Sequence, residues 1–224
     1  MSLIFYDFEV FKKDWLVVFI DPFQQKETVI INDPDQFGSF YTEHKDKIWV
    51  GFNSRNYDQW IAKSILAGFN PKNVNDWIIV EQRKGWEFSD LLRNFPINNF
   101  DVMTGFHGLK TLEAFMGNDI RETSVPFDID RKLTEAEIEE VVKYCRHDVE
   151  QTMEVFIRRK NEFDSQIALI TTFKLTLSNV SKTQAQLAGV ILGATRIETD
   201  DEWHIRLPDT LKLDKYKHIA DWFL

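Results

Sequence analysis

Two acidic side chains share one face of an apolar stretch near the start of the chain. Leu3–Val10 is rich in aromatic and β-branched residues, which is typical of a β-strand. Because successive side chains of a strand point to opposite faces, Asp7 and Glu9 lie on one face while Tyr6 and Phe8 take the other. Two carboxylates on such a strand are costly to bury unless a positive charge lies between them.

Two predicted helices carry side chains suited to the same chemistry. Asp58 falls in the first turn of a helix that follows a short apolar strand, Ile48–Phe52. A capping-box pattern at Thr134 begins the longest predicted helix, on which Tyr144 and Asp148 lie one turn apart at the margin of the apolar stripe. Taken singly, each of these residues has an ordinary structural explanation. Asp58 could simply be an acid favoured in the first turn of a helix, and Tyr144 and Asp148 could be polar residues at the edge of a buried helix face. Four acids in these settings together favour a functional site.

Four carboxylates from separate elements would make an all-oxygen site. Such a site prefers hard divalent cations, Mg²⁺ or Mn²⁺, over zinc. Two of these ions about 3.5–4 Å apart stabilise both the attacking and the leaving oxygen of an in-line phosphoryl displacement. The sequence therefore predicts a two-metal site for phosphoryl transfer.

The residues stand in motifs that resemble, in order, those of the DEDD 3′→5′ exonucleases. The motifs are Asp7-Phe8-Glu9, Asn53-x-x-x-Tyr57-Asp58 and Tyr144-x-x-x-Asp148. Tyr144 places the resemblance in the tyrosine type, because Lys143 stands where the histidine type has its histidine. The second motif resembles the proofreading domain of family B DNA polymerases, especially phage enzymes.

The resemblance implies a role for each motif acid. Asp7, Glu9 and Asp148 would hold the first metal ion. Asp7 and Asp58 would share the second, and Tyr144 would orient the attacking water by a hydrogen bond. The product would be a nucleoside 5′-monophosphate.

Further residues would contact a single-stranded 3′ end. Asn53 and Tyr57 would meet the sugar or the terminal base, with stacking on the tyrosine ring. Leu109 lies in Gly108–Leu112, which resembles a segment that contacts single-stranded DNA in family B exonuclease domains. That segment begins here with glycine where a hydroxyl is expected, and a core position for Leu109 is equally open.

Other charged residues have less defined roles. Arg121 stands roughly where phage enzymes place a lysine that supports the scissile phosphate, and a plain surface position is the alternative. Arg131 and Lys132 are rival candidates for that cation. Asp101, at the end of a predicted strand, could approach the four acids.

The predicted elements indicate an α/β fold. Three strands within residues 3–32 are joined by short turns, which favours an antiparallel meander. Helices and strands then alternate up to a fifth strand at Asn99–Met103. We expect a five-stranded mixed sheet of the ribonuclease H-like kind with helices on both faces, crossed by the long helix so that Tyr144 and Asp148 meet Asp7 and Glu9.

We expect the chain to divide into two parts. Residues 1–160 would form the exonuclease domain and 161–224 a helical or irregular extension. Its helices are expected at Glu162–Lys174 and at Ser181–Leu192, the second N-capped by Ser181. The apolar end at Ala220–Leu224 favours continuation into a polymerase body in a longer chain. None of a polymerase's own catalytic acids can be matched here.

The composition and charge of the chain limit the classes of function that it can have. With 224 residues, 43% hydrophobic and 28% charged, the chain is typical of soluble globular proteins. A single cysteine, Cys145, excludes an internal disulfide, and no apolar run is long enough to cross a membrane, so we expect a cytoplasmic protein, in the host cytoplasm if the source is a phage. The net charge of −9 argues against a general nucleic-acid binder, but not against a nuclease whose acids hold metal ions.

Three functions remain open. The leading prediction is proofreading: excision from single-stranded or frayed DNA 3′ ends, with a polymerase domain of the same or a longer chain as partner. A stand-alone exonuclease acting on RNA, similar to ribonuclease D, would use the same residues, and the contacts to a 2′-hydroxyl that decide between them cannot be read from the sequence. The third is a non-catalytic nucleic-acid-binding module, although such modules usually lose an acid and none is lost here.

Overall fold

The computed structural model describes residues 2–103, 105, 107–195, 210 and 212–219. The apolar chain end at Ala220–Leu224, from which continuation into a polymerase body was expected, lies outside these residues. Among the described helices, none is both long and apolar enough to cross a membrane.

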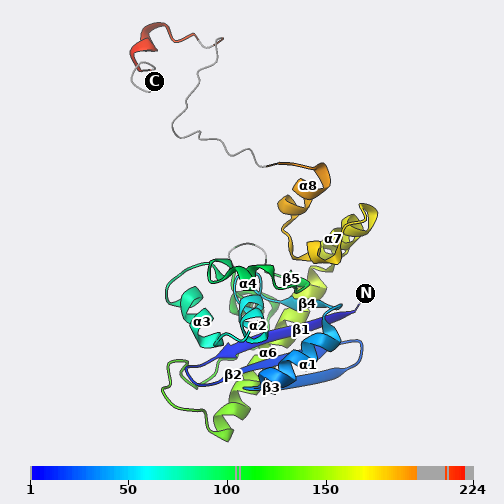
Figure 1. The fold of residues 1–224 in the computed structure, drawn as a ribbon, viewed down its shortest axis with the longest axis vertical. Coiled ribbons are helices and arrows are strands. Elements are labelled where there is room, and N and C mark those ends of the chain that lie inside the picture. The colour runs from blue at the N-terminus through cyan, green and yellow to red at the C-terminus, as the bar shows by residue number, and fades with distance from the viewer. Residues whose placement is uncertain (1, 104, 106, 196–209, 211, 220–224) are drawn as a thin grey trace. The chain divides into compact units, whose positions relative to one another are not determined.

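A five-stranded mixed sheet occupies the centre of the first part of the chain, in the order β3–β2–β1–β4–β5 (Figure 1). An antiparallel meander is formed by β1 (Leu3–Val10), β2 (Trp15–Asp21) and β3 (Lys26–Ile31). On the other side of β1, β4 (Ile48–Gly51) and β5 (Asn99–Asp101) continue the sheet in parallel. The predicted α/β class and its mixed sheet are confirmed.

Helices cover both faces of this sheet (Figure 1). The described helices of the whole chain are α1 (Pro34–His44), α2 (Asp58–Leu66), α3 (Pro71–Ile79), α4 (Asp90–Asn94), α5 (Leu109–Met116), α6 (Glu135–Arg158), α7 (Lys160–Thr172) and α8 (Gln184–Leu192), with short 3-10 helices η1 (Gly85–Glu87), η2 (Leu177–Ser181) and η3 (Asp214–Tyr216). Helices α1 and α2 contribute to the core on one face, and α6 packs against β1 and β2 on the other.

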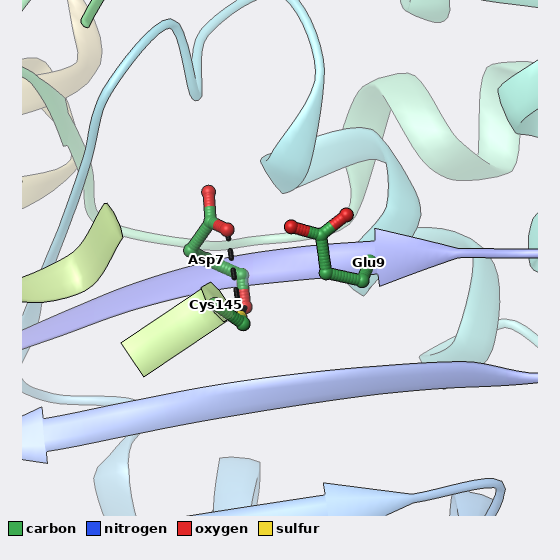
Figure 2. Close-up of side chains that lie close together, drawn as sticks. All are labelled: Asp7, Glu9 and Cys145. Atoms are coloured by element: carbon green, nitrogen blue, oxygen red, sulfur yellow. Dashed lines mark hydrogen bonds between the residues drawn. The ribbon is translucent and has the colours of Figure 1, made fainter. Parts of the chain in front are cut away.

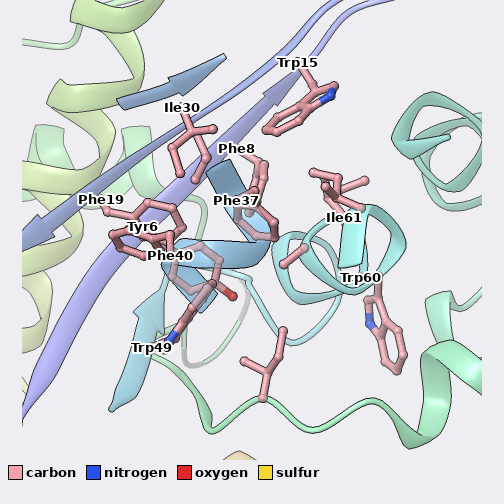
Figure 3. Close-up of a cluster of buried hydrophobic side chains, with 14 of the residues drawn as sticks. Tyr6, Phe8, Trp15, Phe19, Ile30, Phe37, Phe40, Trp49, Trp60 and Ile61 are labelled. Atoms are coloured by element: carbon pink, nitrogen blue, oxygen red, sulfur yellow. The ribbon is translucent and has the colours of Figure 1, made fainter. Parts of the chain in front are cut away.

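Aromatic side chains fill the core between the sheet and α1 (Figure 3). Tyr6 and Phe8 of β1 point into it, and the rings of Phe19 and Phe40 stack with their centroids 4.1 Å apart. Burying this much aromatic surface fixes which face of β1 is the core face. The alternate residues of the strand are thereby directed to the opposite face.

The long helix α6 begins where the capping pattern predicts. The Thr134 side chain accepts a hydrogen bond from the main-chain N–H of Glu137, whose carboxylate accepts one from the N–H of Thr134. Val141, Cys145 and Val149 are fully buried on the side of the helix that meets the sheet. This stripe sets the rotation of α6 and hence the direction of its polar margin.

The described contacts divide the chain into Met1–Gln184 and Ala185–Leu224. Helix α7 packs within the first unit, because the Phe163 ring lies 5.0 Å from Phe100 and 5.1 Å from Phe156, centroid to centroid. This division falls later along the chain than the expected boundary after residue 160.

One predicted helix start is wrong. Helix α8 begins at Gln184, and Ser181 does not cap it. Ser181 instead ends η2, where its hydroxyl accepts a hydrogen bond from the N–H of Asn99 in β5. A tertiary contact to the sheet has replaced the local capping role that the sequence pattern favours.

Candidate metal centre

Asp7 and Glu9 extend their carboxylates on the same side of β1 (Figure 2). Cys145 of α6 lies against the strand at this point, with Sγ 3.3 Å from the main-chain oxygen and 3.5 Å from Oδ2 of Asp7. One ligand atom from each of the three side chains lies within 4.8 Å of the others. The face predicted by the strand period is the face on which the acids are found.

Asp58 is fixed to the same strand by a hydrogen bond. The main-chain N–H of Phe8, between Asp7 and Glu9, donates to Asp58 Oδ1 at 3.1 Å. The parallel pairing of β1 with β4 ends at Phe5 and Val50. Beyond Phe5, no strand of the described residues pairs with β1 on that side. A side-chain oxygen at the start of α2 therefore satisfies a main-chain donor that the sheet leaves unpaired.

The loop before Asp58 is held by Asp101. Its two carboxylate oxygens each accept a main-chain N–H, from Arg55 and from Met103, both at 2.9 Å. Gly51 permits the close return of this loop, because a Cβ there would lie 2.6 Å from Cβ of Ser54. Asp101 thus approaches the acids as a loop-fixing residue whose oxygens are already engaged.

A cation outside the three motifs, Lys110, lies beside both Asp148 and Tyr144. Lys110 Nζ lies 2.5 Å from Asp148 Oδ1 and 4.8 Å from the centroid of the Tyr144 ring. Lys110 is in the second position of α5, inside the segment proposed to contact DNA. Its place in that segment is the only feature of the sequence that points to Lys110, because residue spacing does not show which residue of α5 reaches α6.

The four carboxylates raise one another's pKa values. Burial first, and then the neighbouring acids, raise the pKa values of Asp7 and Glu9 well above their ordinary range. Burial raises the pKa of Asp58 to about 7, and it also raises that of Asp148, against the lowering effect of Lys110. Four carboxylates buried close together favour the binding of protons or cations. A set of oxygen ligands alone fits Mg²⁺ or Mn²⁺.

Tyr144 remains a neutral phenol in this setting. Burial and the charge of Asp148 raise its pKa far above the ordinary value, and its hydroxyl interacts with the Asp148 carboxylate. The side chain can therefore donate a hydrogen bond at neutral pH but does not act as a phenolate base.

Tyr57 and Asn53 lie near the acids but have partners of their own. The Tyr57 hydroxyl donates to Asn75 Oδ1 at 2.7 Å, and its side chain lines a groove together with Glu9. Asn53 has a left-handed backbone (φ 56°), and its Oδ1 accepts a hydrogen bond from Asn56. Asn53 therefore shapes the loop that leads into α2.

Leu109 and Arg121 differ in their distance from the centre. Leu109 is the half-buried first residue of α5, directly before Lys110. Arg121 lines a shallow hollow with His147, and none of the four acids lines that hollow. Leu109 thus lies next to a residue that contacts Asp148. The cation in contact with Asp148 is Lys110, and not Arg121.

The groove beside Glu9 is large enough for a nucleotide. Its volume is about 900 Å³, and its lining includes Glu9, Tyr57 and three lysines, Lys12, Lys13 and Lys72. Five acids of the same lining outnumber these lysines: Glu9, Asp76, Glu81, Asp128 and Asp130. Lys72 is already paired with Asp76, at 2.6 Å. The lining therefore carries a small net negative charge, and much of it is apolar.

A second group of potential metal ligands adjoins the first. One ligand atom each from Glu113, His147 and Asp148 lie within 4.8 Å of one another, and all three residues are buried. Asp148 is also one of the four motif acids, and its charge, in addition to burial, raises the pKa values of Asp7 and Glu9. Nothing in the sequence spacing links Glu113 to His147.

Comparisons of the chain with protein-family models, curated proteins and solved structures found no match. The function is therefore argued from the chemistry of the centre.

Proposed function

We propose that this chain is a two-metal 3′→5′ exonuclease acting on single-stranded or frayed DNA ends, with a ribonuclease H-like fold. The observation that supports this most is the convergence of four carboxylates from three elements, Asp7 and Glu9 of β1, Asp58 of α2 and Asp148 of α6. The tyrosine that the exonuclease motif requires stands beside the last of them. The mixed sheet is compatible with the proposed fold.

The proposed mechanism assigns a task to each side chain. The acids would hold Mg²⁺ or Mn²⁺, and two such ions would supply the Lewis acidity that stabilises the attacking and leaving oxygens. Tyr144, as a neutral phenol, would orient the attacking water by a hydrogen bond. Lys110, rather than Arg121, would place a positive charge next to the scissile phosphate, since its ammonium already touches Asp148.

The strand would approach along the groove that contains Glu9 and Tyr57. The tyrosine ring offers a surface for base stacking, and the partly apolar lining suits an unpaired nucleotide better than a duplex. Because the acids of the groove outnumber its lysines, we expect weak binding with few phosphate contacts.

The first test is activity on labelled single-stranded DNA. With Mg²⁺ or Mn²⁺ the protein should shorten a 5′-labelled strand stepwise from its 3′ end, and a chelator should stop the reaction. Asp7→Asn, which keeps the size of the side chain, serves as the inactive control. Circular single-stranded DNA degraded at a similar rate would indicate an endonuclease instead.

The second test separates proofreading from general degradation. Initial excision rates are compared on two primer–templates that differ only in the terminal 3′ base pair, and the mismatched end should be shortened faster. Equal rates would favour a degradative nuclease. A faster reaction on an RNA strand of the same sequence would favour the ribonuclease alternative, and tight binding without cleavage would favour a non-catalytic module.

A further inference from the structure

Helices α5 and α6 bury a carboxylate oxygen and an imidazole nitrogen that face each other without a hydrogen bond. Glu113 Oε2 and His147 Nε2 lie 3.5 Å apart, and the two side chains are 0% and 8% exposed. Neither atom has a hydrogen-bond partner among the described residues. Buried polar atoms of this kind cost free energy unless a proton, a water or a cation joins them.

The local charges favour a cation. The other oxygen of Glu113, Oε1, lies 3.3 Å from Lys110 Nζ, which also contacts Asp148. A single ammonium group therefore serves two buried carboxylates, and one unit of negative charge is left without a cation. The Lys110 side chain is 29% exposed, so it has a route to solvent if another cation takes its place.

We propose that Glu113, His147 and Asp148 bind a first-row transition-metal ion, for which Zn²⁺ is the best probe. Their ligand atoms all lie within 4.8 Å of one another. Imidazole nitrogen and carboxylate oxygen are both zinc ligands, and three protein ligands would leave one position for water. Hard cations such as Mg²⁺ prefer oxygen alone, so the imidazole separates this site from the proposed catalytic centre in metal preference.

The site would regulate the enzyme through Asp148, a consequence that rests on the proposed function. Zn²⁺ bound by Glu113 and His147 would draw Asp148 away from the Mg²⁺ or Mn²⁺ that the four acids hold. It would also displace Lys110 from its contact with Asp148. Zinc is therefore expected to inhibit strand shortening at concentrations far below that of Mg²⁺.

The decisive experiment measures metal binding directly, with no nuclease assay. Zn²⁺ is titrated calorimetrically into the intact protein in excess Mg²⁺, and the visible ligand-field spectrum of Co²⁺ reports whether nitrogen enters the coordination sphere. His147→Gln and Glu113→Gln, which keep size and polarity, should each weaken Zn²⁺ binding by about tenfold or more. Thermal unfolding of each variant checks that it is folded.

Two matched controls locate the site. His107→Ala removes an exposed histidine outside the cluster and should leave Zn²⁺ binding unchanged. Cys145→Ser tests the alternative group at Asp7 and Glu9, and should also leave it unchanged. Wild-type affinity in both His147→Gln and Glu113→Gln, or binding lost only in Cys145→Ser, would overturn the proposal.

The binding result and the activity result are independent. Zinc binding that requires His147, in a protein with no nuclease activity, would uphold the metal site and reject the proposed function. In an active enzyme, the wild type should be inhibited by micromolar Zn²⁺, and His147→Gln should need at least about tenfold more. Equal inhibition of the two would overturn the regulatory part.

Discussion

The main-chain N–H of Phe8 donates to Asp58 Oδ1 at 3.1 Å, and this bond ties the strand that carries Asp7 and Glu9 to the helix that carries the third acid. Asp7, Glu9 and Asp58 are therefore brought together by main-chain hydrogen bonding and by the core, while Asp148 has Lys110 as its cation. Their mutual repulsion is offset by the rest of the fold. Four predictions follow from how that repulsion is relieved and from the contacts around it.

The metal-free protein should lose stability as the pH rises from 5 to 8. Burial raises the pKa of Asp58 to about 7, and those of Asp7 and Glu9 shift in the same direction. Because these folded-state pKa values lie above the unfolded ones, the stability they contribute is complete below about pH 4 and is lost as the pH rises through the folded values. We expect a loss of about 1–3 kcal/mol, seen by calorimetry as a falling Tm.

Two comparisons check the source of this effect. Mn²⁺ should restore the Tm at pH 8, since it replaces the lost protons. Asp58→Asn, which removes one of the coupled carboxylates, should have a flatter profile without metal. A Tm of the metal-free wild type that did not fall over this range would contradict the charge repulsion described here.

Tyr144→Phe should slow the nuclease without removing the metal. The substitution deletes only the hydroxyl that interacts with Asp148, so we expect a rate lower by about 10–1,000-fold and nearly unchanged Mn²⁺ affinity. Asp7→Ala and Asp148→Ala should cost more, because each removes a ligand. Full activity in Tyr144→Phe, or a loss equal to that of Asp7→Ala, would refute the role of the phenol.

Lys110→Met should destabilise the metal-free protein by about 1–3 kcal/mol at pH 8, because it leaves Asp148 and Glu113 without their shared cation. Lys160→Met is the matched control. Its ion pair with Asp164 is equally short, 2.5 Å, but lies on the surface and should be worth less than about 0.5 kcal/mol. Equal losses in urea unfolding would show that burial does not distinguish the two pairs.

Asp101→Asn should lower stability by about 1–3 kcal/mol, because an amide offers one acceptor where Arg55 and Met103 each donate to a separate oxygen. Activity should fall less than in Asp7→Ala, since Asp101 fixes the loop before Asp58 and would bind no metal. Asp46→Asn, an exposed acid, is the neutral comparison. A stable but inactive Asp101→Asn protein would instead place Asp101 among the ligands.

Local rules in the sequence determined the elements that carry the acids. The period of two in β1 separates Asp7 and Glu9 from the aromatic core face, and the capping box at Thr134 sets the start of α6. Both follow from contacts within a few residues, so they can be read without knowing the fold. The antiparallel meander of β1, β2 and β3 was predictable for the same reason, because short turns join its strands.

Tertiary packing decided what surrounds the acids. Lys110 meets Asp148 across 38 positions of sequence, and Glu113 meets His147, only because α5 packs on α6 in one particular rotation. Ser181 likewise hydrogen-bonds to Asn99 of β5 and does not cap a helix. Arg121 lines a hollow that none of the four acids lines. The sequence determined which residues hold charge and which face of their own element they occupy. The partners of those charges depend on side chains meeting between elements far apart in the chain, which no spacing rule specifies.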